Sequence, residues 1–87
     1  MKNFYSYPAI FYSDSDGISI HFPDLPGCLP CATNIAEAMS TAREALGLHL
    51  LGMELDGEPL PEPTPISRLK PGGGAAVVMV EVSMQPI

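Results

Sequence analysis

Two cysteines stand at a spacing that redox centres and zinc sites both use. Cys28-Leu29-Pro30-Cys31 is a C-x-x-C sequence. A thioredoxin-like centre places its first cysteine at the beginning of a helix, and here the next helical pattern starts several residues later. A tetrahedral zinc site needs four ligands, and His21 and His49 are the only histidines in the chain. A redox or zinc module therefore stays open as an alternative, while two small apolar thiols in or beside a strand are the simpler interpretation.

Three aspartates offer the carboxylates that a metal-dependent nuclease or hydrolase would need. They are Asp14, Asp16 and Asp24. The first two fall in Ser13-Asp14-Ser15-Asp16-Gly17, where the hydrogen-bonding chemistry of a turn accounts for them. Because loops also present recognition residues, we favour a surface patch for a basic partner over catalysis.

The two histidines belong to different patterns. His21 alternates with apolar residues and shares a polar face with Ser19, so we expect it to point to solvent, with no nucleophile assigned to it. His49 falls within an apolar helical stripe. We expect it to pack in the core or at its margin, satisfied by a hydrogen bond.

The elements that must position these side chains begin with a hairpin. Residues 4–12 are rich in aromatic and β-branched types and predict a strand, with Pro8 favouring an edge position. Residues 18–22 alternate as a half-buried strand, joined to the first by a loop of about five residues. A short third strand is predicted over about residues 28–32, although Pro30 cannot donate to a ladder.

One long helix follows, predicted over about residues 35–54. Asn34 is placed to cap it, with Glu37 three residues on as in a capping box. Its apolar stripe consists of Ile35, Ala38, Met39, Ala42, Ala45, Leu46, His49, Leu50 and Met53. Gly47 permits close approach to a sheet, and Asp56-Gly57 ends the helix.

The remaining residues predict a stiff connection and a final strand. Alternating prolines in residues 58–74 favour an extended, polyproline-like spacer along the domain edge. The valine-rich run at 75–84 predicts a strand covered on both faces, lying beside the first strand and parallel to it. The order β-β-β-α-β predicts an α+β fold, a small sheet with one helix packed on one face.

Composition narrows the function. The chain has 87 residues, enough for one domain, and carries 10 acidic against 4 basic residues. The basic residues form no cluster, so direct binding of DNA or RNA by this chain is not expected, and a basic partner protein suits its charge. No segment has the length and hydrophobicity of a signal peptide or a membrane span, and we expect a cytoplasmic protein.

Three segments resemble one family. Ile18-Ser19-Ile20-His21-Phe22-Pro23-Asp24-Leu25-Pro26-Gly27-Cys28 resembles the strand and Asp-Leu-Pro-Gly-Cys turn of the HicB antitoxin domain. The family's helix is similar to two further stretches, Asn34-Ile35-Ala36-Glu37-Ala38 and Ala42-Arg43-Glu44-Ala45-Leu46. Its proline segment is similar to Gly57-Glu58-Pro59-Leu60-Pro61-Glu62-Pro63. The resemblance spans residues 4–84. The chain departs from the pattern at 30–32, which lacks the glycine that the family usually places just before the helix.

The resemblance implies a partial ribonuclease H-like fold and a function. The implied role is that of a non-enzymatic antitoxin that masks the RNA-binding and active surface of a HicA-like toxin, a small basic ribonuclease. The expected contacts, chosen for charge and exposure, are Asp14, Asp16, His21 and Asp24. We expect no cofactor, one HicB-like domain over 1–87 without a C-terminal DNA-binding domain, and oligomers formed through open sheet edges. A degenerate ribonuclease H-like nuclease and the C-x-x-C module remain the alternatives.

Overall fold

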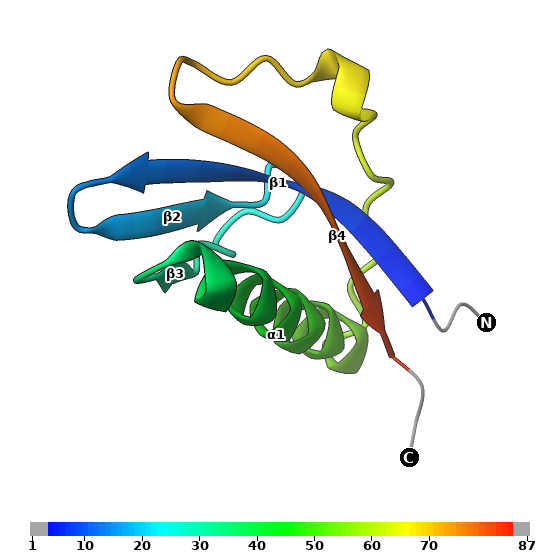
Figure 1. The fold of residues 1–87 in the computed structure, drawn as a ribbon. Helices are drawn as coiled ribbons and strands as arrows, with labels where there is room; N and C mark the ends of the chain where they lie inside the picture. Colours follow the sequence, from blue (N-terminus) through cyan, green and yellow to red (C-terminus); the bar gives the residue numbers. More distant parts are fainter. Residues whose placement is uncertain (1–3, 85–87) are drawn as a thin grey trace.

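In the computed structural model, which describes residues 4–84, two antiparallel strands joined by a tight turn come first (Figure 1). β1 (Phe4–Asp14) and β2 (Gly17–His21) leave a two-residue turn, shorter than the loop predicted from the sequence. The Asp14 carboxylate accepts hydrogen bonds from the Asp16 and Gly17 N–H groups at 2.8 and 3.0 Å. Gly17 has a φ of 144°, and a Cβ there would lie 2.5 Å from the Ala32 carbonyl oxygen, so the turn requires glycine.

The third strand is shorter than predicted. β3 (Cys31–Ala32) pairs with the start of β2, through Ile18 and Ser19. The residue before it, Pro30, adds one bond through its carbonyl oxygen, which accepts from the Ile20 N–H at 2.9 Å. Because proline has no N–H to donate, regular pairing begins only after it.

The helix agrees closely with its prediction. α1 (Ile35–Leu55) begins after Asn34, whose side chain accepts a hydrogen bond from the Glu37 N–H at 2.9 Å. The Glu37 carboxylate accepts a hydrogen bond from the Thr33 hydroxyl at 2.7 Å, in place of the bond from the Asn34 N–H that a capping box would have. Gly57, with a φ of 73°, follows the last turn as a helix-ending residue. None of the helices among residues 4–84 is long and apolar enough to cross a membrane.

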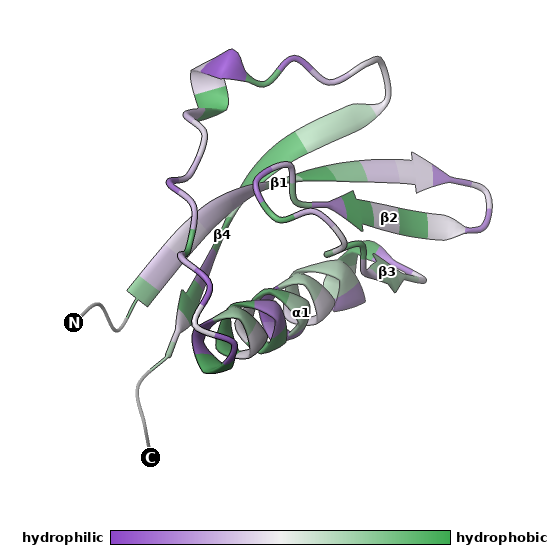
Figure 2. Ribbon diagram, turned by 180° about the vertical axis from the view of Figure 1, so that it is seen from behind, coloured by the Kyte–Doolittle hydropathy of each residue, from purple (hydrophilic) through white to green (hydrophobic). Residues whose placement is uncertain are grey.

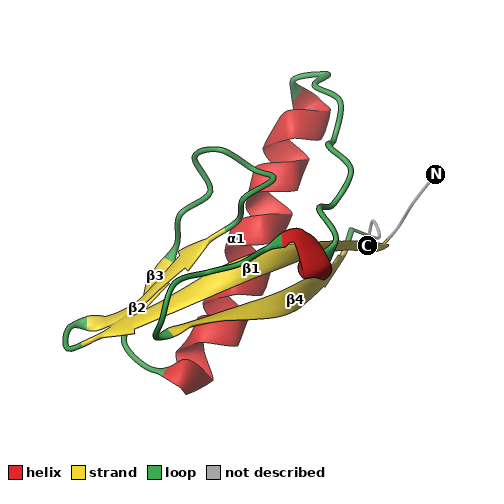
Figure 3. Cartoon of the chain, turned by 90° about the horizontal axis from the view of Figure 1, so that it is seen from above, coloured by secondary structure: helices red, strands yellow, loops and turns green. Residues whose placement is uncertain are grey.

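The last strand runs in the opposite direction to the one predicted. β4 (Ala75–Ser83) pairs antiparallel with β1, from Tyr12↔Ala75 to Phe4↔Ser83. The expectation of a parallel strand was wrong because the connection crosses the whole length of the sheet before β4 starts. It leaves α1 near the beginning of β1 and passes over the face away from α1, where its short helix η1 (Ile66–Arg68) lies above β1 (Figures 1 and 3).

The last strand lies beside the first, as predicted, but it is not covered on both faces. The sheet order is β3-β2-β1-β4, so β4 is an edge strand, while β1 has a neighbour on each side over residues 10–12. Pro8 nonetheless meets the expectation of an edge locally, because residues 4–9 pair with β4 alone. Pro8 and Ile10 point to the face away from α1 and are buried. The connection passes over this face of the sheet (Figure 3), and so does not run only along the domain edge as expected.

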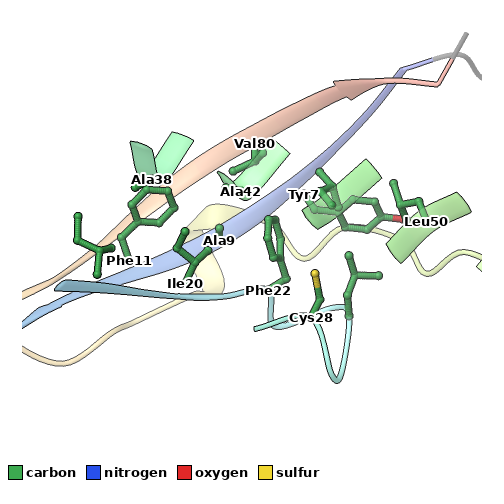
Figure 4. Close-up of a cluster of buried hydrophobic side chains, with 13 residues drawn as sticks. Tyr7, Ala9, Phe11, Ile20, Phe22, Cys28, Ala38, Ala42, Leu50 and Val80 are labelled. Carbon is green, nitrogen blue, oxygen red and sulfur yellow. The ribbon is translucent and has the colours of Figure 1, made fainter. Parts of the chain in front are cut away.

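The core lies between the sheet and α1 (Figure 4). Ala38, Ala42, Leu46 and Leu50 form the buried stripe of the helix. Their partners on the sheet side and in the loop after β2 are Tyr7, Ala9, Phe11, Ile18, Ile20, Phe22, Leu25, Cys28 and Val80. The small alanines at the beginning of α1 let the helix approach the hairpin closely, as Gly47 does at β4, where a Cβ would lie 3.3 Å from the Val82 side chain.

Candidate partner-binding surfaces

The four contact residues predicted from the sequence lie in two separate places. Asp14 and Asp16 are exposed at the turn of the hairpin, whereas His21 is the last residue of β2 and Asp24 lies in the loop after it. The structure therefore does not bring the four together into one patch. Whether any of them touches a partner stays a prediction.

Asp24 has a role inside the fold. Its carboxylate accepts two hydrogen bonds from Thr64, one from the N–H at 2.9 Å and one from the hydroxyl at 2.5 Å. The pair ties the loop after β2 to the connection that crosses the sheet, a bridge between residues 40 positions apart. Both oxygens of Asp24 are thus occupied within the chain.

His21 lies at the edge of a shallow apolar hollow on the sheet face away from α1. The hollow has a volume of about 420 Å³ and is lined by Tyr12, Ser19, Ile20, His21, Leu29, Pro30 and Cys31. His21 is half-buried there rather than fully turned to solvent, while Leu29 and Tyr12 leave much of their apolar surface exposed.

The two cysteines occupy different environments. Cys28 is buried in the core, where its thiol lies 3.9 Å from the Ala45 carbonyl oxygen and burial raises its pKa. Cys31 is exposed at the start of β3. A raised pKa disfavours the thiolate that redox exchange and zinc ligation both require, so Cys28 is poorly suited to either alternative.

Acidic and thiol side chains do not converge on a metal site within the described part of the chain. Among residues 4–84, no three side chains of His, Cys, Asp or Glu lie close enough to hold a metal ion together. A metal-dependent nuclease works through such clustered carboxylates. Asp14 and Asp16 instead share a turn, and Asp24 is held by Thr64.

Tyr7 connects the core to the segment that follows the helix. Its ring is buried and its hydroxyl donates a hydrogen bond of 2.6 Å to the Pro61 carbonyl oxygen. Burial, followed by the nearby Asp24 carboxylate, raises the pKa of the Tyr7 phenol. The neutral hydroxyl thus fixes the path of the proline segment across the end of the sheet.

Sequence reasoning missed a set of exposed leucines on the helix. Leu48, Leu51 and Leu55 are 64%, 45% and 78% exposed, on the side of α1 away from the core. In Figure 2, hydrophobic and hydrophilic residues are mixed on the last turns of α1. The signal was present in the sequence, since these leucines fall outside the stripe that accounts for helix packing.

Next to Leu48 the helix borders a groove of about 660 Å³. Its walls come from the second half of α1, from the loop after β2 and from the residues that follow the helix. The lining residues are Leu25, Pro26, Leu48, His49, Gly52, Met53, Asp56, Glu58 and Pro59. His49 is half-buried here, at the margin of the core as predicted, but its side chain makes no hydrogen bond to the described residues, contrary to the prediction.

Comparison with known proteins gives one family and a consistent fold. The family model "HicB_like antitoxin of bacterial toxin-antitoxin system" matches residues 7–87. A solved toxin–antitoxin complex from Streptococcus pneumoniae contains a similar chain, with a TM-score of 0.85 and 23% identity over 93% of this chain and 70% of that one. A chain of a HicA–HicB toxin–antitoxin complex is 27% identical, with a TM-score of 0.66 over 94% of this chain and 100% of its own.

A curated relative is much longer than the region it shares. It is an uncharacterised 14.9 kDa protein from the rep-hol intergenic region of Haemophilus phage HP1, 39% identical over 62 residues. The match includes 71% of this chain and 47% of the relative, so the chain spans about half the length of that protein.

Proposed function

The chain belongs to the HicB-like antitoxins of bacterial toxin–antitoxin systems, and from this premise we propose that it neutralises a HicA-like toxin. It does so by covering the RNA-binding and active surface of that toxin, a small basic ribonuclease. The observation that carries this proposal is the match of the family model over residues 7–87. A structural neighbour that is itself part of a HicA–HicB complex supports the choice of partner.

The charge of the chain supports binding of a basic protein. Its net charge is −6, and opposite charges speed the encounter of two proteins and disfavour wrong partners. We propose that the chain acts as an inhibitor and not as an enzyme, since its family is one of antitoxins. We place it in the cytoplasm, together with the RNA that the toxin would cleave.

Direct binding of nucleic acid by this chain alone is not part of the proposal. The described basic side chains are dispersed: Arg43 lies on α1, Arg68 on η1 and Lys70 on the connection. Strong binding to nucleic acid relies on several phosphate contacts made together.

Among the predicted contacts, the structure makes Asp16 and His21 the informative ones to test. Both side chains are accessible, and neither makes a hydrogen bond to another described residue. Asp14 and Asp24 remain proposed contacts, but substituting them also removes bonds within the fold. Loss of toxin binding on Asp16→Ala or His21→Ala, without loss of stability, would support a contact at the hairpin.

We also propose that copies of the chain associate through β4. Its outer side has no neighbour within the described sheet, and an unpaired strand edge invites another strand. Met79 is 42% exposed on this strand, so Met79→Lys should leave the fold intact and place two like charges close together in a paired edge. A lower molar mass for this variant by light scattering would support pairing through β4, and an unchanged mass would count against it.

The proposed function is tested with the product of the neighbouring reading frame. We expect a small basic protein that co-purifies with this chain and cleaves RNA, and whose cleavage stops when this chain is added at equimolar amounts. The control is the same RNA assay with an unrelated acidic domain of similar size and charge. If the neighbouring product neither binds this chain nor is inhibited by it, the function is wrong although the fold stands.

A further inference from the structure

The groove beside the second half of α1 is lined by a glycine, Gly52, that the packing of the fold does not require. Gly52 lies within the helix, three residues before its end, and lines the groove. A Cβ built on Gly52 would meet no atom within 4 Å, and Gly52 is not among the glycines with positive φ. Glycine inside a helix costs about 1 kcal/mol relative to alanine, so its presence here weakens the helix without a packing reason.

The other glycine of α1, Gly47, does have a packing reason. A Cβ on Gly47 would lie 3.3 Å from the Val82 side chain, so that glycine lets the helix approach β4. Gly52 is little more than one turn further on, and open space stands where a side chain would be. An unfilled position between Leu48 and Met53 leaves room for a side chain from another molecule.

The charged groups at this groove restrict what can enter it. Asp56 and Glu58 line its end, and apart from His49 the groove has no basic side chain among the described residues that line it. A second copy of the chain would bring its own acidic groups toward these carboxylates, and at a net charge of −6 it has few cations to offer. A basic segment with an apolar side chain fits both the walls and the rim.

We propose that this groove receives an apolar side chain of the toxin over Gly52, with a neighbouring lysine or arginine of the toxin against Asp56 and Glu58. The exposed Leu48 extends the apolar wall outward, so the anchor would be surrounded by apolar surface on entry. This inference rests on the proposed function, because it names where that partner docks.

The test fills the groove without weakening the fold. In Gly52→Gln, the new side chain occupies the open space and has a higher helix propensity than glycine, so the melting temperature should not fall. We expect its affinity for the toxin to fall at least tenfold in titration calorimetry. The matched control is Ser40→Gln, at an exposed position of the same helix distant from the groove, which should bind within twofold of the unaltered chain.

A charge exchange tests the rim separately. Glu58→Lys should weaken toxin binding at low salt more than Glu62→Lys, which makes the same change in net charge at an exposed position outside this groove. If Gly52→Gln binds the toxin as tightly as the unaltered chain does, the inference is wrong, and the proposed function still stands. A changed molar mass of Gly52→Gln in the absence of toxin, with toxin affinity unaltered, would assign the groove to a second copy and also overturn it. If the unaltered chain does not bind the toxin at all, the proposed function fails, and this inference with it.

Discussion

The two sides of α1 both carry leucines, but the leucines of one side are buried and those of the other are exposed. Leu46 and Leu50 are completely buried against the sheet, while Leu48 and Leu55 are 64% and 78% exposed. The buried pair lies on the stripe that holds the domain together, and a helix of this kind needs no leucine on its other side. The helix therefore carries more apolar surface than it buries against the sheet, which is typical of a surface that a partner covers.

The largest effect should come from shortening one leucine on each side of the helix. Leu46→Ala removes buried methyl groups and leaves a cavity, so we expect a loss of about 3 kcal/mol in the free energy of unfolding. Leu48→Ala should change that free energy by less than about 0.5 kcal/mol. Urea unfolding followed by circular dichroism measures both values. Equal losses would show that the exposed leucines stabilise the fold as much as the buried ones do.

Two of the acidic residues, Asp24 and Asp16, differ in the same way. Asp24→Ala leaves the Thr64 N–H and hydroxyl without their acceptor, and we expect a loss of about 2 kcal/mol, because bonds to a charged group are among the stronger ones. Asp16→Ala serves as the matched control, since the Asp16 side chain makes no hydrogen bond in the described structure. A similar loss in both variants would contradict a structural role specific to Asp24.

A smaller effect is expected at Tyr7. Tyr7→Phe removes the hydrogen bond to the Pro61 carbonyl oxygen and should lower the free energy of unfolding by about 1 kcal/mol at neutral pH. Because burial raises the pKa of Tyr7, the folded state favours the neutral phenol. That contribution is complete below the unfolded pKa of about 10 and is lost as the pH rises through the folded pKa. The free energy of unfolding, measured by urea titration at several pH values between 8 and 11, should therefore fall more steeply with pH for the unaltered chain than for Tyr7→Phe.

The smallest effects separate the two glycines of the helix. Gly52→Ala should raise the free energy of unfolding by about 0.5–1 kcal/mol, because a methyl group enters open space and the helix propensity improves. Gly47→Ala should gain less or lose stability, because its methyl group presses on Val82 at 3.3 Å. Thermal unfolding of the two variants measures the difference. A larger gain for Gly47→Ala would remove the physical distinction between the two positions.

Local patterns predicted most of the elements. The cap at Asn34, the end of the helix at Gly57 and the alternation in β2 were all visible in the sequence, because each depends on residues a few positions apart. The place of β4 beside β1 was predicted, but its antiparallel direction and its edge position were not, since both depend on the path of residues 58–74 across the sheet. A run of valines is compatible with a central strand that is covered on both faces. It is equally compatible with an edge strand of which the helix covers one face only.

The candidate surfaces divide in the same way. Exposure of Asp14 and Asp16 followed from the chemistry of the turn, but the bonds between Asp24 and Thr64 join residues 40 positions apart and left no local sign. The groove over Gly52 combines side chains from the helix and from two loops. A glycine within a helical pattern marked the position, and only the fold shows that Gly47 has a packing neighbour and Gly52 has none.

The pairing of β1 with β4 also sets the order in which the domain can mature during translation. Phe4 pairs with Ser83, so the first strand to leave the ribosome waits for the last before its ladder closes. Until residues 75–83 emerge, residues 4–9 of β1 have no strand beside them, although the hairpin and α1 are already made. Contacts between residues so distant in the chain are slow to form. A newly made copy is therefore exposed to proteases and to other strands for as long as its own last strand is missing.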